Sequence, residues 1–295
     1  MSKLYLVTIY VTTFNRLSLL KRALDSVRMQ TYKNIEILIV DDCSTDGTQK
    51  FLQEISQQDS RIKVFLKDKN GGACESRNIA IQNARGEYIT GLDDDDYFLP
   101  SRIENFVNNL SNANDNIVLF DNPIIKVDDR PIITKKRIIM NALKSKKIRA
   151  KDLIYSNYIG NQVFIKTAIL RKCGGFDKNM PMWQDLECWY NLLKYNEGYA
   201  LRLNSYTYVM DISHEMDRIS NFKLEKGIKA FSYFNEKHKL GSREAIILFC
   251  QLYGYDHQLI RLQPLILRVL TRPNVSTILN TVKNMFYYFR KNKDL

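Results

Sequence analysis

The stretch Tyr88-Ile-Thr-Gly-Leu-Asp-Asp-Asp-Asp-Tyr97 carries a short apolar run directly into four consecutive aspartates. A short apolar run of this kind is typical of a buried β-strand when the surrounding chain alternates strands with helices. The stretch therefore predicts a strand over residues 88–92 whose carboxyl end holds a concentrated negative charge.

Four neighbouring carboxylates at a strand end repel one another and resist desolvation. Alternate side chains of an extended segment share a face, so we expect Asp93 and Asp95 to point together and Asp94 and Asp96 to point away. A hard divalent cation carrying a diphosphate would relieve the repulsion. The alternative is a solvated acidic turn at the N-terminus of a helix expected near Pro100. The position after a strand of an alternating unit favours the cation.

The chain before this stretch alternates two hydrophobic periods. Strands are expected over residues 4–11, 35–40 and 62–66, and helices over 17–30, from about 48 to 55, and over 73–84. This order predicts an α/β fold, Rossmann-like, with a mostly parallel sheet flanked by helices. Such sheets bind ligands at the carboxyl ends of their strands. The polar clusters Thr12–Arg16, Asp41–Asp46 and Asp93–Asp96 each follow a strand directly, so we expect them at one site.

The second half of the chain is less regular. Strands are expected over residues 116–120 and 162–165, a helix over 185–195, and a pair of strands over 199–203 and 206–210. Beyond about residue 220 the pattern is helical to the end, with breaks at Pro264 and Pro273. We therefore expect one α/β domain over residues 1–220 and a helical, basic region over residues 221–295.

The composition is that of a globular protein, with 45% apolar and 26% charged residues in a chain of 295. No signal-peptide pattern and no apolar run of 18 residues is present, which favours the cytoplasm over a membrane-spanning protein. The five cysteines are odd in number and never spaced as Cys-x-x-Cys. We expect no disulfide framework or zinc site, and five buried cysteines in a reducing compartment.

The net charge of +12 is concentrated in two segments, residues 131–151 and 261–295. Basic surfaces attract nucleic acid, anionic lipid or phosphorylated substrates, and charge alone does not choose among them. No nucleic-acid-binding motif is present, so we expect no nucleic acid. Residues 257–292 mix apolar positions with Arg and Lys, which indicates either an amphipathic helix pair at a membrane surface or a helical subdomain packed on the core.

Phosphate-binding motifs rich in glycine are missing from the sequence. Neither Gly-x-Gly-x-x-Gly nor Gly-x-x-x-x-Gly-Lys-Ser/Thr occurs, so a metal ion is expected to carry any diphosphate. Of the acids after the second strand, Asp41 or Asp42 could accept hydrogen bonds from a base or ribose. The alternative role for this segment is helix capping by Ser44, Thr45 or Asp46.

Together these segments resemble glycosyltransferase family 2, the inverting transferases of GT-A fold that assemble bacterial polysaccharides. The resemblance spans roughly residues 3–220. It consists of five motifs in order, at residues 11–16, 30–48, 70–78, 86–100 and 174–177. It implies a metal-dependent enzyme that takes a sugar from a UDP-sugar donor. A nucleotidyltransferase would instead carry a glycine-rich basic loop after its first strand, which residues 12–16 do not provide.

The resemblance also implies roles for individual residues. Those matched to nucleotide-sugar binding are Thr12, Asn15, Arg16, Asp41, Asp42, Arg77, Asp93 and Asp94. Mn²⁺ or Mg²⁺ would be held mainly by Asp95, with Asp93 and His214. The segment Gln184–Trp189 matches the family's Glu-Asp-x-x-x-Trp, which makes Asp185 the catalytic base and leaves Gln184 as a departure. Trp183 would stack on the acceptor sugar, although a tryptophan here could equally be a core residue.

In polysaccharide-building members of the family the acceptor is a saccharide on undecaprenyl diphosphate at the inner face of the cell membrane. The resemblance thus implies O-antigen or capsule synthesis, a peripheral membrane location and a hexose donor such as UDP-Glc or UDP-Gal. Transfer of GlcNAc or GalNAc is the alternative, followed by a non-catalytic module that binds sugar nucleotides. The sequence does not predict the oligomeric state.

Overall fold

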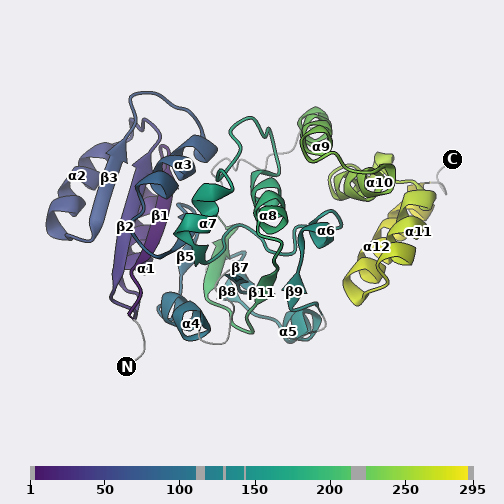
Figure 1. Ribbon diagram of the computed structural model, residues 1–295, viewed down its shortest axis with the longest axis horizontal. Helices are drawn as coiled ribbons and strands as arrows, with labels where there is room; N and C mark the ends of the chain where they lie inside the picture. Colours follow the sequence, from purple (N-terminus) through teal and green to yellow (C-terminus); the bar gives the residue numbers. More distant parts are fainter. Residues whose placement is uncertain (1–3, 111–116, 129–130, 143, 214–223, 292–295) are drawn as a thin grey trace.

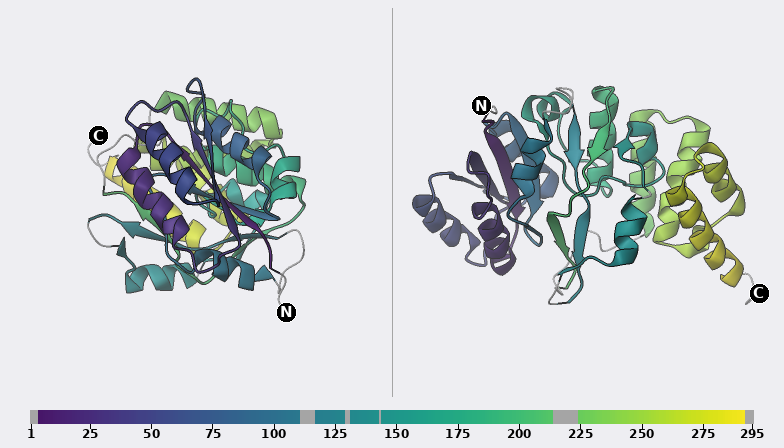
Figure 2. Two further views of the ribbon diagram at one scale, coloured as in Figure 1. Left: turned by 90° about the vertical axis from the view of Figure 1, so that its left-hand side faces the viewer. Right: turned by 90° about the horizontal axis from the view of Figure 1, so that it is seen from below.

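The computed structural model describes residues 4–110, 117–128, 131–142, 144–213 and 224–291. Figure 1 shows a sheet flanked by helices at the N-terminal end, two smaller sheets in the middle and a group of helices at the C-terminal end. The two ends of this arrangement lie at opposite ends of the long axis, which is also clear in the view from below in Figure 2.

The largest sheet carries the first half of the chain. Its strands are β1 (Val7–Thr13), β2 (Ile35–Asp41), β3 (Ile62–Leu66), β4 (Tyr88–Asp93) and β10 (Ile165–Lys166), in the order β10-β4-β1-β2-β3. All neighbours are parallel except β10. Thr12 lies beside Asp93 and Thr13 beside Asp41 in the strand register. The parallel pairing therefore brings the three polar clusters of the sequence to one edge of the sheet, as expected.

Helices cover both faces of this sheet, and the strand pattern shows why. The helices are α1 (Leu17–Arg28), α2 (Thr48–Gln58), α3 (Ala73–Asn83), α4 (Arg102–Asn108) and α7 (Thr167–Lys172). Ile9 and Ile37 pack with α1, α2 and α4 in one core cluster, whereas Tyr10 and Leu38 pack with α3 and α7 in the other. Strands buried on both faces read as continuous apolar runs, which is how β1 and β2 appear in the sequence.

Two smaller sheets follow. One has the order β6 (Val118–Phe120), β11 (Ala200–Arg202), β9 (Lys147–Ile148), and the other β5 (Tyr97–Phe98), β12 (Tyr208–Asp211), β7 (Pro123–Lys126), β8 (Pro131–Ile132). The expected pairing of residues 199–203 with 206–210 is wrong. β11 pairs parallel with β6, and β12 pairs parallel with β7. The chain from β6 to β7 and the chain from β11 to β12 therefore pass side by side from one small sheet to the other. The strand expected over residues 162–165 begins only at Ile165.

The remaining helices connect the middle of the molecule to its C-terminal end. They are α5 (Lys135–Ala142), α6 (Ala150–Leu153), α8 (Gln184–Tyr195), α9 (Leu224–His238), α10 (Ser242–Phe249), α11 (Leu262–Thr271) and α12 (Val275–Lys291), with 3₁₀ turns at Cys250–Gly254 and His257–Leu259. Pro264 was expected to break a helix, but it lies in the first turn of α11, where its missing N–H is harmless. Pro273 does separate α11 from α12.

The cysteines and the helix lengths bear on two further expectations. All five cysteines are free, and Cys74, Cys188 and Cys250 are buried. Cys43 and Cys173 are only partly buried, so the expectation of five buried cysteines is wrong for these two. Within the described ranges, the structure contains no helix with the length and apolar character needed to cross a bilayer.

Candidate active site

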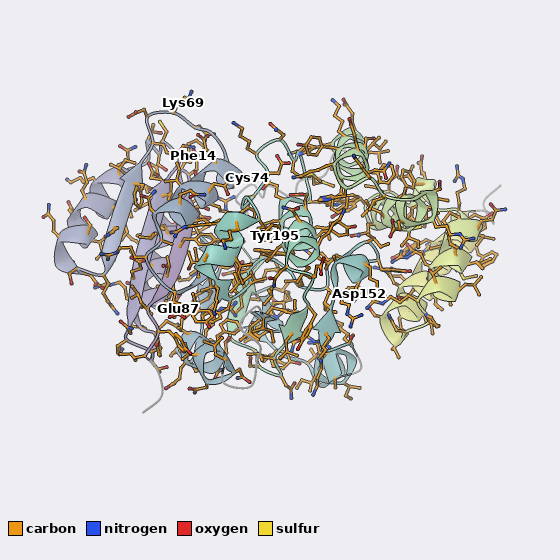
Figure 3. All side chains as sticks on the ribbon, viewed as in Figure 1. Phe14, Lys69, Cys74, Glu87, Asp152 and Tyr195 are labelled. Carbon is orange, nitrogen blue, oxygen red and sulfur yellow. The ribbon has the colours of Figure 1, made fainter. Side chains whose placement is uncertain are left out.

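A cavity of about 750 Å³ lies at the carboxyl ends of β1, β2 and β4. Thr12, Asp42 and all four aspartates of the 93–96 run line it on the side of the sheet. Asp185 and its neighbours line it from the start of α8, and Tyr255 lines it from the C-terminal region. Figure 3 labels Phe14, another lining residue, above the strand ends. One concave site therefore combines three distant parts of the chain.

The four aspartates form a turn rather than an extended segment. β4 ends at Asp93, and the backbone N–H of Asp96 donates to the Asp93 carbonyl at 3.1 Å. The expected alternation of faces is therefore wrong. The Nη1 atom of Arg16 instead lies 3.1 Å from an Asp94 oxygen and 3.2 Å from an Asp95 oxygen, which brings these two neighbours to one cation.

The outer two aspartates have separate partners. Asp93 accepts hydrogen bonds from Arg77 at 2.9 Å, from Gln162 at 3.1 Å and from Asn161 at 3.2 Å. Asp96 is buried and accepts from the hydroxyl of Tyr208 and from the backbone N–H of Asp211. The alternative of a solvated helix cap is not supported, because α4 begins after Ser101 and receives no side-chain cap.

Burial disfavours the ionised form of two carboxyl groups in this turn. It raises the pKa of Asp94 to about 6, although Arg16 and Thr13 oppose the shift. It also raises the pKa of Asp96 well above the usual carboxyl range, with a further contribution from Asp93 and Asp95. A raised carboxyl pKa means that the ionised form lacks compensating positive charge. The turn can therefore accept an additional cation.

Asp185 lies in the first turn of α8 and faces the same cavity. Its Oδ1 atom is 3.6 Å from Arg77 Nη1 and has no hydrogen-bond partner among the described residues. Burial raises the pKa of Asp185 to about 7; Arg77 lowers it and Asp93 raises it further. A carboxyl group with this pKa in a cleft, without a bound proton donor, is a candidate general base.

Arg77 links the two acidic parts of the site. Its side chain is almost fully buried, pairs with Asp93 and Asp185, and lies over the ring of Phe176 at 5.0 Å. The two carboxylates raise the pKa of this guanidinium above its ordinary value despite its burial. Arg77 is thus the cation shared by Asp93 and Asp185 at the centre of the site.

The acids after β2 divide into two roles. Asp42 lines the cavity and accepts hydrogen bonds from Lys67 and from the backbone N–H groups of Gly71 and Gly72. Asp41 is fully buried and does not line the cavity. It accepts instead from the backbone N–H of Ser44 at 2.9 Å and holds the turn that follows β2.

Helix capping in this segment falls to Asp46. Its carboxylate accepts from the backbone N–H of Leu17, at the start of α1, and from that of Thr48, at the start of α2. Asn15 braces the same turn, because its Oδ1 atom accepts from the N–H of Thr45 at 2.7 Å. Asn15 does not line the cavity, so the structure gives it a supporting position rather than one in the predicted nucleotide site.

Trp183 precedes α8, is partly exposed and lines the cavity beside Asp185. Its φ of 63° lies in the left-handed region, which is uncommon for a bulky residue and is a form of strain that concentrates at functional sites. His214, predicted as a metal ligand, lies outside the described residues. Among the residues that are described, no three His, Cys, Asp or Glu side chains are grouped to hold a metal ion.

Several residues of the site were missed by the sequence analysis. Gln162 orients Asp93 and accepts from the hydroxyl of Tyr10 at 3.0 Å. A Cβ atom at Gly91 would meet Gln162 Oε1 at 2.2 Å, so this glycine makes room for the contact. A glycine inside a strand is the signal that might have indicated a close approach here. Gln251 and Tyr255 carry no such signal, since they lie far from every motif.

Comparisons with known proteins are consistent with this geometry. Residues 8–174 match the family model described as glycosyl transferase family 2. The chain is 35% identical over 240 residues to the putative colanic acid biosynthesis glycosyl transferase WcaA of Escherichia coli, covering 79% of this chain and 81% of that protein. It is 32% identical over 197 residues to an uncharacterized glycosyltransferase of Rickettsia typhi, of which the match covers 60%.

Solved structures show the same fold. Staphylococcus aureus TarS in complex with UDP-GlcNAc superimposes with a TM-score of 0.68 at 16% identity, over 94% of this chain and 79% of that one. The mannosyltransferase PcManGT of Pyrobaculum calidifontis, in complex with GDP-Man and Mn²⁺, gives 0.60 at 16% identity, over 98% and 87%. These likenesses confirm the predicted GT-A α/β fold and its helical C-terminal extension.

Proposed function

This chain belongs to glycosyl transferase family 2, and from that membership we propose that it is an inverting, metal-dependent hexosyltransferase. It would move a hexose such as Glc or Gal from a UDP-sugar to a saccharide carried on undecaprenyl diphosphate. The observation that carries the proposal is the shared cavity, in which Arg77 lies between the aspartate turn and Asp185. Such a cavity can place a diphosphate leaving group and a base on either side of one sugar.

The donor would occupy the side of the cavity formed by the strand ends. Thr12 and Asp42 would contact the uracil, and Arg77 the diphosphate. Asp93 and Asp95 fit a hard cation, because their carboxylates reach the cavity with side-chain exposures of 19% and 15%. Mg²⁺ commonly takes only one or two protein carboxylates and completes its shell with substrate phosphates and water. When bound, Mn²⁺ or Mg²⁺ would neutralise charge on the departing diphosphate.

Asp185 would act as the general base. Its ionised carboxylate takes the proton of an acceptor hydroxyl, and the hydroxyl oxygen bonds to the anomeric carbon. The bond from that carbon to the UDP oxygen breaks, and its electron pair leaves with UDP. Attack from the face opposite UDP inverts the anomeric centre, so an α-linked donor gives a β-linked product. A pKa of about 7 suits this role, because a base is most effective when its pKa lies near the working pH.

The C-terminal helices support a peripheral position at the inner face of the cell membrane. The large apolar residues exposed on α11 and α12 are Ile266, Leu270, Val275, Ile278, Leu279, Val282, Phe286 and Phe289. Apolar side chains flanked by Arg and Lys are typical of helices that lie in an anionic lipid surface. The likeness to the E. coli colanic acid relative supports a place in polysaccharide synthesis.

We keep the division into a transferase domain, residues 1–220, and a helical region, residues 221–295, as part of the proposal. Gln251 and Tyr255 of the second part line the cavity of the first. The helical region would thus complete the acceptor side of the site, where Trp183 would stack on the sugar, as well as contact lipid.

A donor screen tests the proposed reaction. UDP-Glc, UDP-Gal, UDP-GlcNAc and UDP-GalNAc are each incubated with a synthetic GlcNAc- or GalNAc-diphosphate-lipid, with Mn²⁺, Mg²⁺ or EDTA. We expect metal-dependent UDP release with a hexose donor and a β-linkage in the product by NMR. Turnover of an N-acetylhexosamine donor alone would favour the alternative sugar class. Donor binding without turnover of any donor would favour the non-catalytic module, and an α-linked product would contradict the single displacement.

A further inference from the structure

The basic segment at residues 131–151 has no role in the proposed reaction, although part of it borders a second cavity. This cavity has a volume of about 220 Å³ and is lined by residues of α5, β11, the loop after α6 and the turn between α11 and α12. Three of its lining residues are cations: Lys144, Arg202 and Arg272. Asp121 is the single acid among the lining residues that the structure describes.

Asp121 does not compensate these three cations, because it is already engaged. One of its oxygens pairs with the buried Arg102 at 2.6 Å. The other accepts from the backbone N–H and the hydroxyl of Thr207. Its negative charge is thus matched by Arg102. Of the three cations, Arg272 is itself paired with Asp152, so Arg202 is the buried cation whose charge no carboxylate of the described residues matches.

Arg202 is the most informative of the three cations. The residue is nine-tenths buried, and its Nη2 atom donates to the carbonyl oxygens of Lys144 and Ser145. No carboxylate of the described residues lies within 4 Å of its guanidinium. Burial lowers its pKa from the ordinary arginine value. A buried guanidinium held only by neutral carbonyls is stabilised by an anion that reaches its remaining N–H groups.

Arg272 and Lys144 surround this guanidinium with further charge. Arg272 pairs with Asp152 at 2.9 Å and lies over the rings of Tyr155 and Tyr158. Figure 3 labels Asp152 beside α6, on the side of the molecule that faces the C-terminal helices. Lys144 is exposed, and its ammonium contacts the side-chain oxygen of Asn141 at 2.8 Å. One wall of the cavity thus contains Arg272, which lies over two tyrosine rings, and the exposed Lys144 lies at its rim.

The position of the cavity connects two features of the proposed function. Asn157 lines both this cavity and the one that contains Asp185. Arg272 and Asn274, in the turn between α11 and α12, and Ser276, in the first turn of α12, also line it. The exposed apolar residues of these two helices are proposed to contact lipid. A ligand that extends from Asp185 across Asn157 would therefore place its next group in the basic cavity and its tail near those helices.

We propose that this second cavity binds the phosphate or diphosphate group of the acceptor, between the sugar at Asp185 and the lipid at α11–α12. The assignment to the acceptor rests on the proposed function. The chemistry of the site does not, because Lys144, Arg202 and Arg272 offer forked and point-charge donors suited to any phosphate. The volume corresponds to about seven water molecules at roughly 30 Å³ each, which accommodates a diphosphate.

A direct binding experiment tests the site without a substrate. Inorganic pyrophosphate is titrated calorimetrically into the full chain saturated with UDP and EDTA, so that the donor side is occupied and free of metal. We expect one equivalent to bind, and Lys144→Gln to weaken binding roughly tenfold, the effect of losing one charge-assisted contact. Lys146→Gln is the matched control, because Lys146 is an exposed lysine of the same segment that does not line the cavity.

The proposal is overturned if pyrophosphate does not bind, or if K146Q weakens it as much as K144Q. Lys144 is chosen because its side chain is exposed, so its loss should leave the fold intact; Arg202 also holds residues 144 and 145. Unchanged thermal unfolding of K144Q verifies this. Arg272→Lys provides a second variant that keeps the charge and loses the fork, and it should weaken binding less than K144Q.

Kinetic measurements distinguish the possible sources of the phosphate. For an acceptor diphosphate, K144Q should raise KM roughly tenfold for a glycosyl-diphosphate-lipid and leave KM unchanged for the same sugar on an uncharged alkyl chain. If K144Q instead changes only binding to phosphatidylglycerol vesicles, the anion is a membrane headgroup and the acceptor assignment is wrong. If no acceptor turns over, the proposed function fails, while the pyrophosphate titration still decides whether the cavity binds an anion.

Discussion

The two ends of the molecule differ in which side chains they bury and which they expose. At the N-terminal end, β1 and β2 are buried on both faces, and the carboxylates at the end of β4 pair with Arg16 and Arg77. At the C-terminal end, the local hydrophobic core has four buried apolar residues among those that the structure describes, and α11 and α12 expose large apolar side chains. The first end thus presents a cavity with charged walls, and the second presents exposed apolar side chains.

The charged residues that line the two cavities also differ between the two ends. The cavity at the strand ends is lined by six carboxylates and two arginines, whereas the cavity near α11 is lined by three cations, of which Arg272 pairs with Asp152, and by one acid that pairs with Arg102. An excess of carboxylate side chains accommodates a metal ion, and an excess of cationic side chains accommodates a phosphate. Under the two proposals above, the first cavity would hold the donor and the reacting acceptor sugar, and the second the phosphate of the acceptor, and each assignment can be tested separately.

Among the substitutions at the N-terminal end, Arg77→Gln should cause the largest loss of stability. It leaves Asp93 and Asp185 without their shared cation, and breaking a buried ion pair costs about 3–5 kcal/mol of the free energy of unfolding. Urea denaturation of the variant measures this. Arg85→Gln is the matched control, because Arg85 also pairs with a buried acid, Glu36, but is itself 63% exposed. We expect R85Q to lower the free energy of unfolding by about 1 kcal/mol or less. Equal losses for R77Q and R85Q would contradict the central electrostatic role of Arg77.

Asp95→Ala should lower the affinity for UDP in the presence of Mn²⁺ by about a hundredfold, as expected for loss of a metal ligand. Calorimetric titration of UDP with and without metal measures the effect. Asp25→Ala, which removes a 62% exposed acid from α1, should leave the affinity unchanged. If wild-type protein binds UDP equally well with and without metal, the proposed role of the cation is wrong.

The pKa of Asp185 sets the expected pH dependence. Because burial raises this pKa from 3.8 to about 7, the carboxyl group is protonated below that pH and cannot accept the acceptor proton. We predict that kcat/KM falls about tenfold per pH unit below 7 and reaches a plateau above it. A profile that is flat down to pH 5 would show that Asp185 is ionised throughout, or that it is not the base.

Leu270→Ser should weaken binding to anionic liposomes at low salt by roughly tenfold, because this residue is 74% exposed on α11. The free energy of unfolding should change by only about 0.5 kcal/mol. Leu66→Ser, an exposed leucine of β3, provides the control at the opposite end and should not affect liposome binding. In contrast, Leu265→Ala, at a fully buried position of the same helix, should cost about 2–5 kcal/mol of stability.

The N-terminal end could be predicted closely from the sequence because each of its elements is locally determined. A short, largely apolar run such as Ile35–Val40 is typical of a strand within a covered sheet when helices alternate with it, and the helical period of Leu20, Ala23, Leu24 and Val27 defines one buried face. The polar residues that follow the strands meet because parallel strands end at the same edge. Position along the chain was therefore enough to bring Thr12 and Asp42 near the aspartates.

The failures share a different cause, which is long-range packing. The turn at Asp93–Asp96 is shaped by Arg16 and Tyr208, neither of which is its neighbour in sequence. The separation of β11 from β12 depends on strands β6 and β7, some eighty residues earlier. Asp41 and Asn15 accept hydrogen bonds from backbone N–H groups, and their predicted contacts with a nucleotide sugar stay predictions.

The proposed mechanism depends most on Asp185 as the general base, and one measurement tests this role directly. Single-turnover transfer from the active UDP-sugar is compared for the wild type, Asp185→Asn and the exposed control Asp25→Asn, together with UDP affinity. We predict that D185N binds UDP normally and transfers sugar about 10²–10⁴-fold more slowly, the usual contribution of a general base, while D25N matches the wild type. Transfer by D185N at a rate near that of the wild type would contradict the assignment of the base and the proposed mechanism.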